Sequence, residues 1–256
     1  PPGRPYDLQK WSEEIDDAAG ARMADHVPSV AGSNAGRPRS LLTRLTDERA
    51  DWRLIEGPFS RVYRVRTAEG EEFFIKTPKH DPGEEIVDFV HRLDHPHTVH
   101  KMTQAEWMIA HERDLLRYVH QHSSFGRAVR HMPEPIFLER SELARLHQYA
   151  DRHFGGTHGG PWLRTKAAPG VNLQSVLNEE ITKIPFDASA AAVRARMRFI
   201  RRIMIRVARA VHGLHHANIR HLDLKPDEIY LADGGSKVTV LDYGGAEIPT
   251  NGRLSI

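Results

Sequence analysis

Two short motifs, joined by a predicted hairpin, constrain the fold of this chain more than any other feature. The first motif, His-Leu-Asp-Leu-Lys-Pro-Asp-Glu, spans residues 221–228 and runs into the apolar stretch Ile-Tyr-Leu. A glycine-rich turn at residues 233–236 leads to a second apolar stretch, which ends in Asp-Tyr-Gly at residues 242–244. Short apolar runs around a glycine-rich turn predict a β-hairpin. We therefore expect the two motifs to face one cleft.

The joined motifs resemble the catalytic loop and the metal-binding loop of the protein kinase superfamily, in particular of bacterial Ser/Thr kinases. The family pattern is His-Arg-Asp-Leu-Lys-Pro-x-Asn, then two strands, then Asp-Phe-Gly. The order and the spacing agree, but Leu222 stands at the arginine position and Glu228 at the asparagine position. The resemblance implies an α+β, two-lobed kinase-like fold, with a small antiparallel-sheet N-lobe and a reduced helical C-lobe.

Phosphoryl transfer depends on positioning and charge stabilisation rather than on covalent help from the protein. By resemblance, Asp223 would accept the proton of the attacking hydroxyl, and Lys225 would reach the transferring phosphate. Asp242 would hold Mg²⁺, an ion that prefers carboxylate and phosphate oxygens, and Glu228 can serve as a further ligand. The resemblance therefore implies ATP and Mg²⁺ as cofactors. The implied function is an ATP-dependent phosphotransferase that acts on a hydroxyl of a protein or a small molecule.

An alternative is a pseudokinase, which is a nucleotide-binding or scaffolding regulatory module without turnover. Glu228 favours it, because glutamate is longer and more negative than asparagine and must change the metal site. The degenerate glycine-rich segment described next favours it as well. Both interpretations stay open at the level of the sequence.

Residues 54–65 fit the start of a kinase-like small lobe. Gly57 and Val62 match the glycine-rich loop pattern, but two of its three glycines are replaced, one of them by Ser60. Such a loop brings backbone N–H groups close to phosphate oxygens, and Pro58 has no N–H to offer. By resemblance Gly57, Ser60 and Val62 contact the nucleotide, and we expect a stiffer loop with a weaker grip on phosphate.

A lysine and a helical glutamate should pair in this fold. Lys76 ends a predicted strand and resembles the lysine that holds the α- and β-phosphates. Apolar residues recur at near-helical intervals over residues 105–119, which predicts a helix. Glu112 precedes a Leu-Leu pair there, as the glutamate of the family precedes its apolar pair, so we choose it as the partner. Glu106 and Glu85 are rivals.

The segment from residue 162 to 177 resembles the hinge between the lobes and the helix that follows it. Thr165 falls at the gatekeeper position. By resemblance, the backbone N–H and C=O groups from Lys166 to Ala168 would contact adenine. The Pro-Gly pair that follows predicts a bend.

Residues 190–216 form the clearest predicted helix, because apolar residues recur at three- and four-residue steps. Its arginines lie largely off the apolar stripe. Alone, a basic amphipathic helix could bind a membrane or nucleic acid. A solvated face next to the kinase-like loop is favoured, so we do not expect nucleic acid as a partner. The arginines are Arg194, Arg198, Arg201, Arg202 and Arg209.

Composition sets broader limits. The chain has 256 residues, enough for a two-lobed domain. A formal charge of +2 and a pI near 9.0 do not require a polyanionic partner. The absence of cysteine excludes disulfides and cysteine metal sites, and no apolar run reaches the length of a membrane span. We expect a cytoplasmic protein.

Three regions follow from the motifs: an N-terminal extension and linker over residues 1–50, an N-lobe over 51–165, and a partial C-lobe over 166–256. Leu8, Trp11, Ile15 and Ala19 could form one helical stripe in the extension. Residues from about 77 to 104 are interpreted as an insertion in the N-lobe. Four histidines in it have spacings that could hold a metal, but a surface cluster is favoured: His91, His95, His97 and His100.

The family pattern stops early, because twelve residues (245–256) follow Gly244. A protein kinase continues through an activation segment and a helical substrate-docking region. Two expectations are open: a further domain after Ile256, or a minimal kinase. Leu222 cannot pair with a phosphorylated activation loop, so we expect no control by such phosphorylation.

Overall fold

The computed structural model describes residues 40–57, 59–79, 84–90, 99–154, 160–182 and 189–248. The chain divides into two compact units, residues 1–38 and 39–256, and the elements below belong to the second. Several expectations concern residues outside the described ones: the helical stripe of the extension, Pro58, and the histidines His91, His95 and His97.

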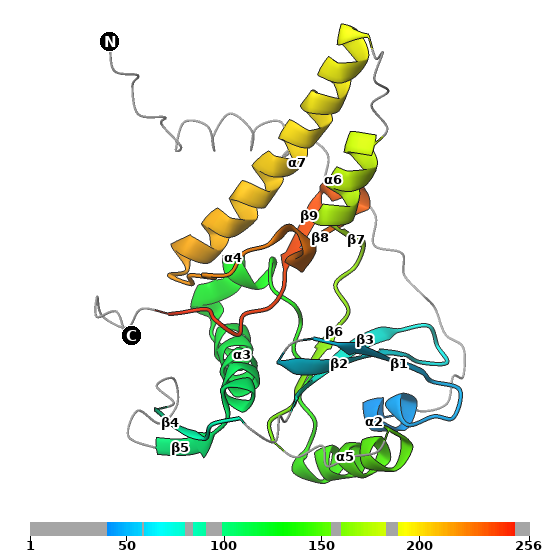
Figure 1. Cartoon of the computed structure of the whole chain (residues 1–256), viewed down its shortest axis with the longest axis vertical. Helices are drawn as coiled ribbons and strands as arrows, with labels where there is room; N and C mark the ends of the chain where they lie inside the picture. The colour runs from blue at the N-terminus through cyan, green and yellow to red at the C-terminus, as the bar shows by residue number, and fades with distance from the viewer. Residues whose placement is uncertain are drawn as a thin grey trace. The chain divides into compact units, whose positions relative to one another are not determined.

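A four-stranded antiparallel sheet in the order β1-β2-β3-β6 forms the first part of this unit (Figure 1). The strand register places Val62 opposite Lys76, and Phe74 opposite Thr165. Side chains alternate between the two faces of a strand, so these four residues share one face of the sheet. The strands are β1 (Asp51–Glu56), β2 (Ser60–Arg66), β3 (Glu72–Pro78) and β6 (Leu163–Lys166).

The opposite face of the sheet is covered by α2 (Leu41–Leu45) and α5 (Arg140–Phe154), as Figure 1 shows. The helices and the sheet share one apolar core, and full burial of each large side chain in it contributes about 1.5–3 kcal/mol. Its buried members are Leu42, Leu45, Tyr63, Val65, Phe73, Ile75, Leu146, Ala150 and Trp162.

The helix predicted over residues 105–119 is α3 (Gln104–Gln121), one residue longer at its start and two at its end. A capping box sets the start: the Thr103 hydroxyl accepts from the Glu106 N–H, and the Glu106 carboxylate accepts from the Thr103 N–H. Such reciprocal bonds satisfy two exposed donors of a first turn. Before α3, strands β4 (Val87–Val90) and β5 (Val99–Met102) pair within the expected insertion.

The remaining part is mainly helical, with a three-stranded sheet in the order β7-β8-β9. The helix predicted over residues 190–216 is α7 (Ala190–His216), capped by the Ser189 hydroxyl. The predicted hairpin is β8 and β9, paired antiparallel. The elements are α4 (Gly126–Val129), β7 (Val171–Asn172), α6 (Leu173–Thr182), β8 (Ile229–Ala232) and β9 (Lys237–Val240), with 3₁₀ turns at Ser123–Phe125, Pro226–Glu228 and Asp233–Gly235.

The bend predicted after the hinge depends on Gly170. Its φ is +93°, and a Cβ at this position would lie 2.0 Å from the Leu231 carbonyl oxygen. Only glycine combines this backbone conformation with such a close approach. The antiparallel sheet followed by the helical part confirms the predicted α+β class. Within the described residues, no helix is both long and apolar enough to cross a bilayer.

Candidate functional site

Lys76 connects the first sheet to two carboxylates that are far away in the sequence. Its Nζ lies 2.9 Å from Glu112 Oε2 on α3 and 2.7 Å from Asp242 Oδ1. The side chain of Lys76 is 19% exposed and that of Glu112 only 4%. Burial by itself lowers the pKa of Lys76, but the charges of Glu112 and Asp242 outweigh it and hold that pKa above its ordinary range. Lys76 is therefore a fixed positive charge at neutral pH.

Glu112 is the partner of Lys76 that was chosen from the sequence, and the two rivals lie elsewhere. Glu106 is used in the capping box of α3, and Glu85 is exposed. The second oxygen of Glu112 accepts a hydrogen bond of 3.0 Å from the Tyr243 N–H. One buried carboxylate thus holds both the β3 lysine and the Asp-Tyr-Gly motif. No pattern in the sequence indicates the bond to Tyr243.

Asp242 is held in a left-handed backbone conformation, with φ at +61°. A non-glycine residue in this region stores about 1–3 kcal/mol of strain, which is common at functional sites. Burial alone would raise the pKa of Asp242, but the charge and hydrogen bond of Lys76 and the Gly244 N–H hold that pKa below its ordinary value. Asp242 is therefore ionised at neutral pH.

His221 fixes the junction between the two motifs. Its Nε2 donates to the Leu241 carbonyl at 2.7 Å, and its ring meets the Tyr243 ring edge-on at 4.9 Å between centroids. His221 is buried and Tyr243 is fully buried. These contacts tie the loop that carries Asp223 to the residues around Asp242.

Asp223 and Lys225 are both more than half exposed, and their side chains lie 2.7 Å apart. Lys225 also approaches Glu228 at 3.6 Å. The backbone of Glu228 accepts a 2.8 Å hydrogen bond from the Leu241 N–H, next to Asp242. The predicted residues of the two motifs therefore form one polar group, with Asp223 at its open side.

Glu228 is the most unusual member of this group. Burial, reinforced by the negative charge of Asp242, raises its pKa to about 7, although Lys225 acts in the opposite direction. Its Oε2 is buried and has no hydrogen-bond partner among the described residues. A carboxylate oxygen without a donor, close to a second carboxylate, fits a divalent cation. No cluster of three or more His, Cys, Asp or Glu suited to a metal occurs in the described ranges, so phosphate and water would complete such a site.

One backbone N–H group of the loop between β1 and β2 is hydrogen-bonded within the loop itself. The Gly57 N–H donates to the Ser60 carbonyl at 2.8 Å, and the Lys79 N–H donates to the Phe59 carbonyl at 3.0 Å. Ser60 is buried, and Val62 lies on the same sheet face as Lys76. Because the Gly57 N–H already has an acceptor, it is not available to a phosphate in this conformation. A weaker grip of this loop on phosphate stays a prediction.

The hinge residues also make internal bonds. Thr165 is buried, the Lys166 N–H donates to the Glu134 carbonyl, and the Ala167 N–H donates to the Glu72 carbonyl, both at 2.9 Å. No backbone hydrogen bond of the Ala168 N–H occurs among the described residues. Ala168 is therefore the predicted hinge residue with an amide free for a ligand.

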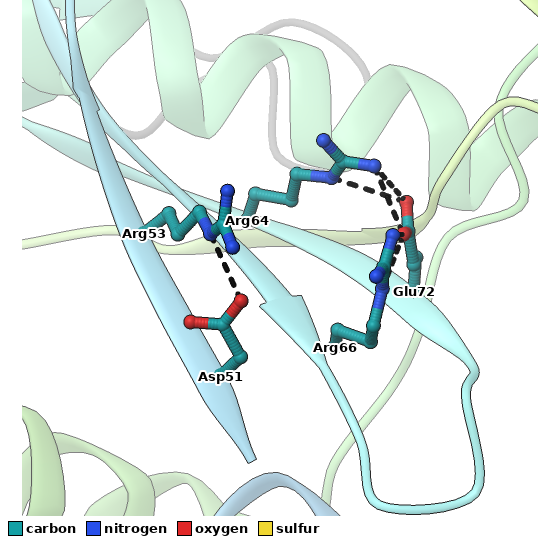
Figure 2. Close-up of polar contacts among 5 residues, drawn as sticks. All are labelled: Asp51, Arg53, Arg64, Arg66 and Glu72. Atoms are coloured by element: carbon teal, nitrogen blue, oxygen red, sulfur yellow. Dashed lines mark hydrogen bonds and ion pairs between the residues drawn. The ribbon is translucent and has the colours of Figure 1, made fainter.

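A network of charged side chains surrounds Glu72 on β3, next to the predicted hinge. Figure 2 shows Arg64 and Arg66 on either side of the Glu72 carboxylate, with the Arg53–Asp51 pair on the neighbouring strand. Hydrogen bonds from Arg64 and then Arg66 lower the pKa of Glu72. The Glu72 carbonyl accepts from the Ala167 N–H, so the residue at the centre of this network also contacts the predicted hinge. Sequence reasoning missed it, since it depends on strand register.

A hollow of about 930 Å³ borders the hinge on the side of the α4 region. None of the residues Lys76, Asp223 and Asp242 lines it, whereas the predicted hinge residues 166–168 do. Its lining comes from residue 120 and from the segments 129–134, 166–169 and 236–239.

Comparison with known proteins gives limited sequence similarity. No protein-family model matches the chain. The Serine/threonine-protein kinase AfsK of Streptomyces coelicolor is 31% identical over 96 residues, and that of Streptomyces griseus is 29% identical over 96 residues. Each match covers 38% of this chain and 10% of the relative, so the chain spans about a tenth of the length of these curated relatives.

One solved structure, of a Stt7 homolog from Micromonas algae soaked with ATP, aligns with 87% of this chain and 56% of that chain. The TM-score is 0.48 and the sequence identity 17%. The matches to the two kinases are local, and they agree with the resemblance of the paired motifs to the protein kinase superfamily.

Proposed function

We propose that this domain is an ATP-dependent phosphotransferase, which transfers the γ-phosphate to a hydroxyl with the help of Mg²⁺. The observation that carries the proposal is the Lys76 ammonium held between Glu112 and Asp242, because this joins the sheet, α3 and the second motif at one point. Similarity to Ser/Thr kinases over 96 residues supports the same reaction class. The substrate hydroxyl belongs to a protein side chain or to a small molecule.

The roles follow from charge and exposure. Lys76, fixed by Glu112, offers positive charge to the α- and β-phosphates. Mg²⁺, held by Asp242 and Glu228, would neutralise phosphate charge. Asp223 is open to solvent at its carboxylate, so a substrate hydroxyl can reach it and transfer its proton there. Lys225, 2.7 Å from Asp223, supplies positive charge next to the point of attack.

In this proposal the nucleotide contacts three residues of the first loop and β2: Gly57, Ser60 and Val62. The adenine lies next to Thr165 and the stretch from Lys166 to Ala168. The two N–H groups at positions 166 and 167 already have protein acceptors. We therefore assign the adenine contact to the backbone of Ala168.

The test is ATP turnover by the full chain with radiolabelled ATP, comparing wild type with Asp223→Asn and Asp242→Asn. Loss of the proton acceptor lowers turnover by about 10²–10⁴-fold, and loss of Asp242 should be at least as severe. Nucleotide binding is measured in parallel, because Asp223→Asn should retain it. Turnover that neither variant changes would contradict the proposal.

A second candidate is the pseudokinase, favoured by the internally bonded Gly57 N–H and by the protonation of Glu228 near neutral pH. It predicts nucleotide binding that depends on Lys76 but no turnover in wild type. The same assay separates the two, since the candidates differ only in turnover.

A further inference from the structure

Arg164 on β6 is a buried arginine, and no acidic side chain among the described residues forms a hydrogen bond or ion pair with it. Its residue is 6% exposed. Its Nη1 has no hydrogen-bond partner among the described residues, and its Nε makes one long bond of 3.4 Å to the Ile136 carbonyl. A buried charge normally finds a paired group of opposite sign. Arg164 therefore calls for an explanation beyond packing.

Two further arginines, Arg113 and Arg117, lie one turn apart on α3. Arg117 stacks on Phe137, the residue that follows Ile136, and the Ile136 carbonyl accepts from Arg164. Arg113 points its Nε and Nη2 at the Asp114 carboxylate, at 2.7 and 2.9 Å. Arg117 is exposed, and its guanidinium carbon lies 5.1 Å from the centroid of the Phe137 ring. Three guanidinium groups and one carboxylate leave a formal charge of +2 (3 − 1).

The charges of the two α3 arginines affect the pKa of Arg164, the buried member of the three. Burial, followed by the charges of Arg113 and Arg117, lowers the pKa of Arg164 to about 10. Arg164 is still protonated at neutral pH, so three positive charges are held together there. A buried charge without a paired group of opposite sign is destabilising. An anion at this place would recover part of that cost.

We propose that Arg113, Arg117 and Arg164 form a binding site for a phosphate-type oxyanion, separate from the nucleotide cleft. A guanidinium presents five N–H donors in a planar fork, which matches phosphate better than a point charge does. Exposure rises from Arg164 through Arg113 to Arg117, so Arg117 is the member that a solute can reach first. The anion is either free phosphate or a phosphorylated side chain.

Such an anion would connect two elements of the proposed active site. It would bridge α3, which carries Glu112, and β6, which continues into Thr165 and the hinge. Occupancy should therefore favour the arrangement in which Glu112 contacts Lys76. This regulatory consequence rests on the proposed function, whereas anion binding itself does not.

Binding of inorganic phosphate to the full chain tests the site, by calorimetry and thermal shift at constant ionic strength with chloride as the reference. All measurements are made on the wild-type chain and repeated with Lys76→Met, so that any binding in the nucleotide cleft is recognised by its loss. We expect saturable binding and a rise in melting temperature. Arg117→Met and Arg164→Met should each weaken Kd by about tenfold or more, while Arg209→Met, an exposed arginine of α7, should leave it unchanged.

Arg117→Met decides the matter if Arg164→Met does not fold, because Arg117 is exposed and its loss opens no cavity. A response that does not saturate, that chloride reproduces, or that persists in Arg117→Met overturns the proposal. O-phosphoserine serves as a second probe: tighter binding than inorganic phosphate identifies a phosphorylated side chain as the source, and equal binding identifies free phosphate. Because none of these readouts involves turnover, an inactive domain would not affect the result.

Discussion

At the scale of single residues, the tyrosine of the Asp-Tyr-Gly motif makes a testable contribution to stability. The Tyr243 ring is fully buried, and its hydroxyl has no hydrogen-bond partner among the described residues. Burial, reinforced by the charge of Glu112, raises the pKa of this hydroxyl well above its ordinary value. An unsatisfied buried hydroxyl costs about 1–3 kcal/mol. Tyr243→Phe should therefore raise the free energy of unfolding by about 1 kcal/mol, measured by urea denaturation.

The matched control for that change is Tyr230→Phe on β8, where the side chain is only half-buried. It should alter stability by a few tenths of a kcal/mol at most, as surface changes usually do. A Tyr243→Phe variant less stable than wild type would mean that the hydroxyl has a partner after all.

Glu228 gives stability a pH dependence of defined sign. Its pKa is about 7 in the folded protein, against an ordinary value of 4.5. Between these pH values the folded state keeps a proton that the unfolded state has lost, so stability falls as pH rises through the window. Glu228→Gln removes this fall, and should gain on the order of 2 kcal/mol over wild type between pH 5 and pH 8. Urea denaturation at several pH values measures it.

Exposed Glu85 supplies the control, since Glu85→Gln should follow the wild-type pH profile. The free energies of unfolding of wild type and Glu228→Gln could instead change in parallel from pH 5 to pH 8. That result would mean that Glu228 is ionised throughout and that its buried Oε2 accepts a hydrogen bond.

At the scale of elements, the pair between β3 and α3 should behave as a coupled unit. Lys76 and Glu112 are both largely buried and 2.9 Å apart. Removal of one partner leaves the other charge buried without that partner, although Lys76 keeps Asp242 as a second partner. A double-mutant cycle of Lys76→Met and Glu112→Gln, followed by urea denaturation, should give a coupling energy of about 1–3 kcal/mol. Additive effects would show that α3 is not held by this pair.

Elements with a long periodic pattern, or with a turn motif between two apolar runs, were predictable from the sequence, whereas the short helix α2 was not. The helix predicted over residues 190–216 has those bounds in the structure, because its apolar repeat is long and Ser189 caps its start. By contrast, α2 has five residues, fewer than an isolated helix needs, and exists through the burial of Leu42 and Leu45. The position of α2 depends on packing against one face of the first sheet, and no local sequence pattern indicates that packing.

The candidate site divides in the same way. Motif spacing was enough to select Glu112 as the partner of Lys76 and to group Asp223, Glu228 and Asp242. Contacts that depend on burial or register had no signal in the sequence: the Tyr243 N–H on Glu112, the Gly57 N–H closed on Ser60, and the orphan nitrogen of Arg164. These arise only when distant segments pack together, so they required coordinates.

At the scale of the whole molecule, the proposed nucleotide site must couple to global stability. A ligand that binds only the folded state stabilises it by about 2.7 kcal/mol at a hundred times its Kd. ATP must exchange the Lys76–Asp242 contact of 2.7 Å for contacts to phosphate and metal, so binding should require both residues and a divalent ion. We expect ATP with Mg²⁺ to raise the melting temperature of the full chain, and excess EDTA to cancel most of this rise.

Lys76→Met should abolish that response, because the phosphates lose the fixed positive charge at the end of β3. Lys101→Met, which removes an exposed lysine of β5, should leave it intact. Since Asp223 is open to solvent and touches only Lys225 in this group, Asp223→Asn should also retain the thermal shift while losing turnover. A stabilisation by ATP that survives both EDTA and Lys76→Met would place the nucleotide somewhere other than between the two motifs.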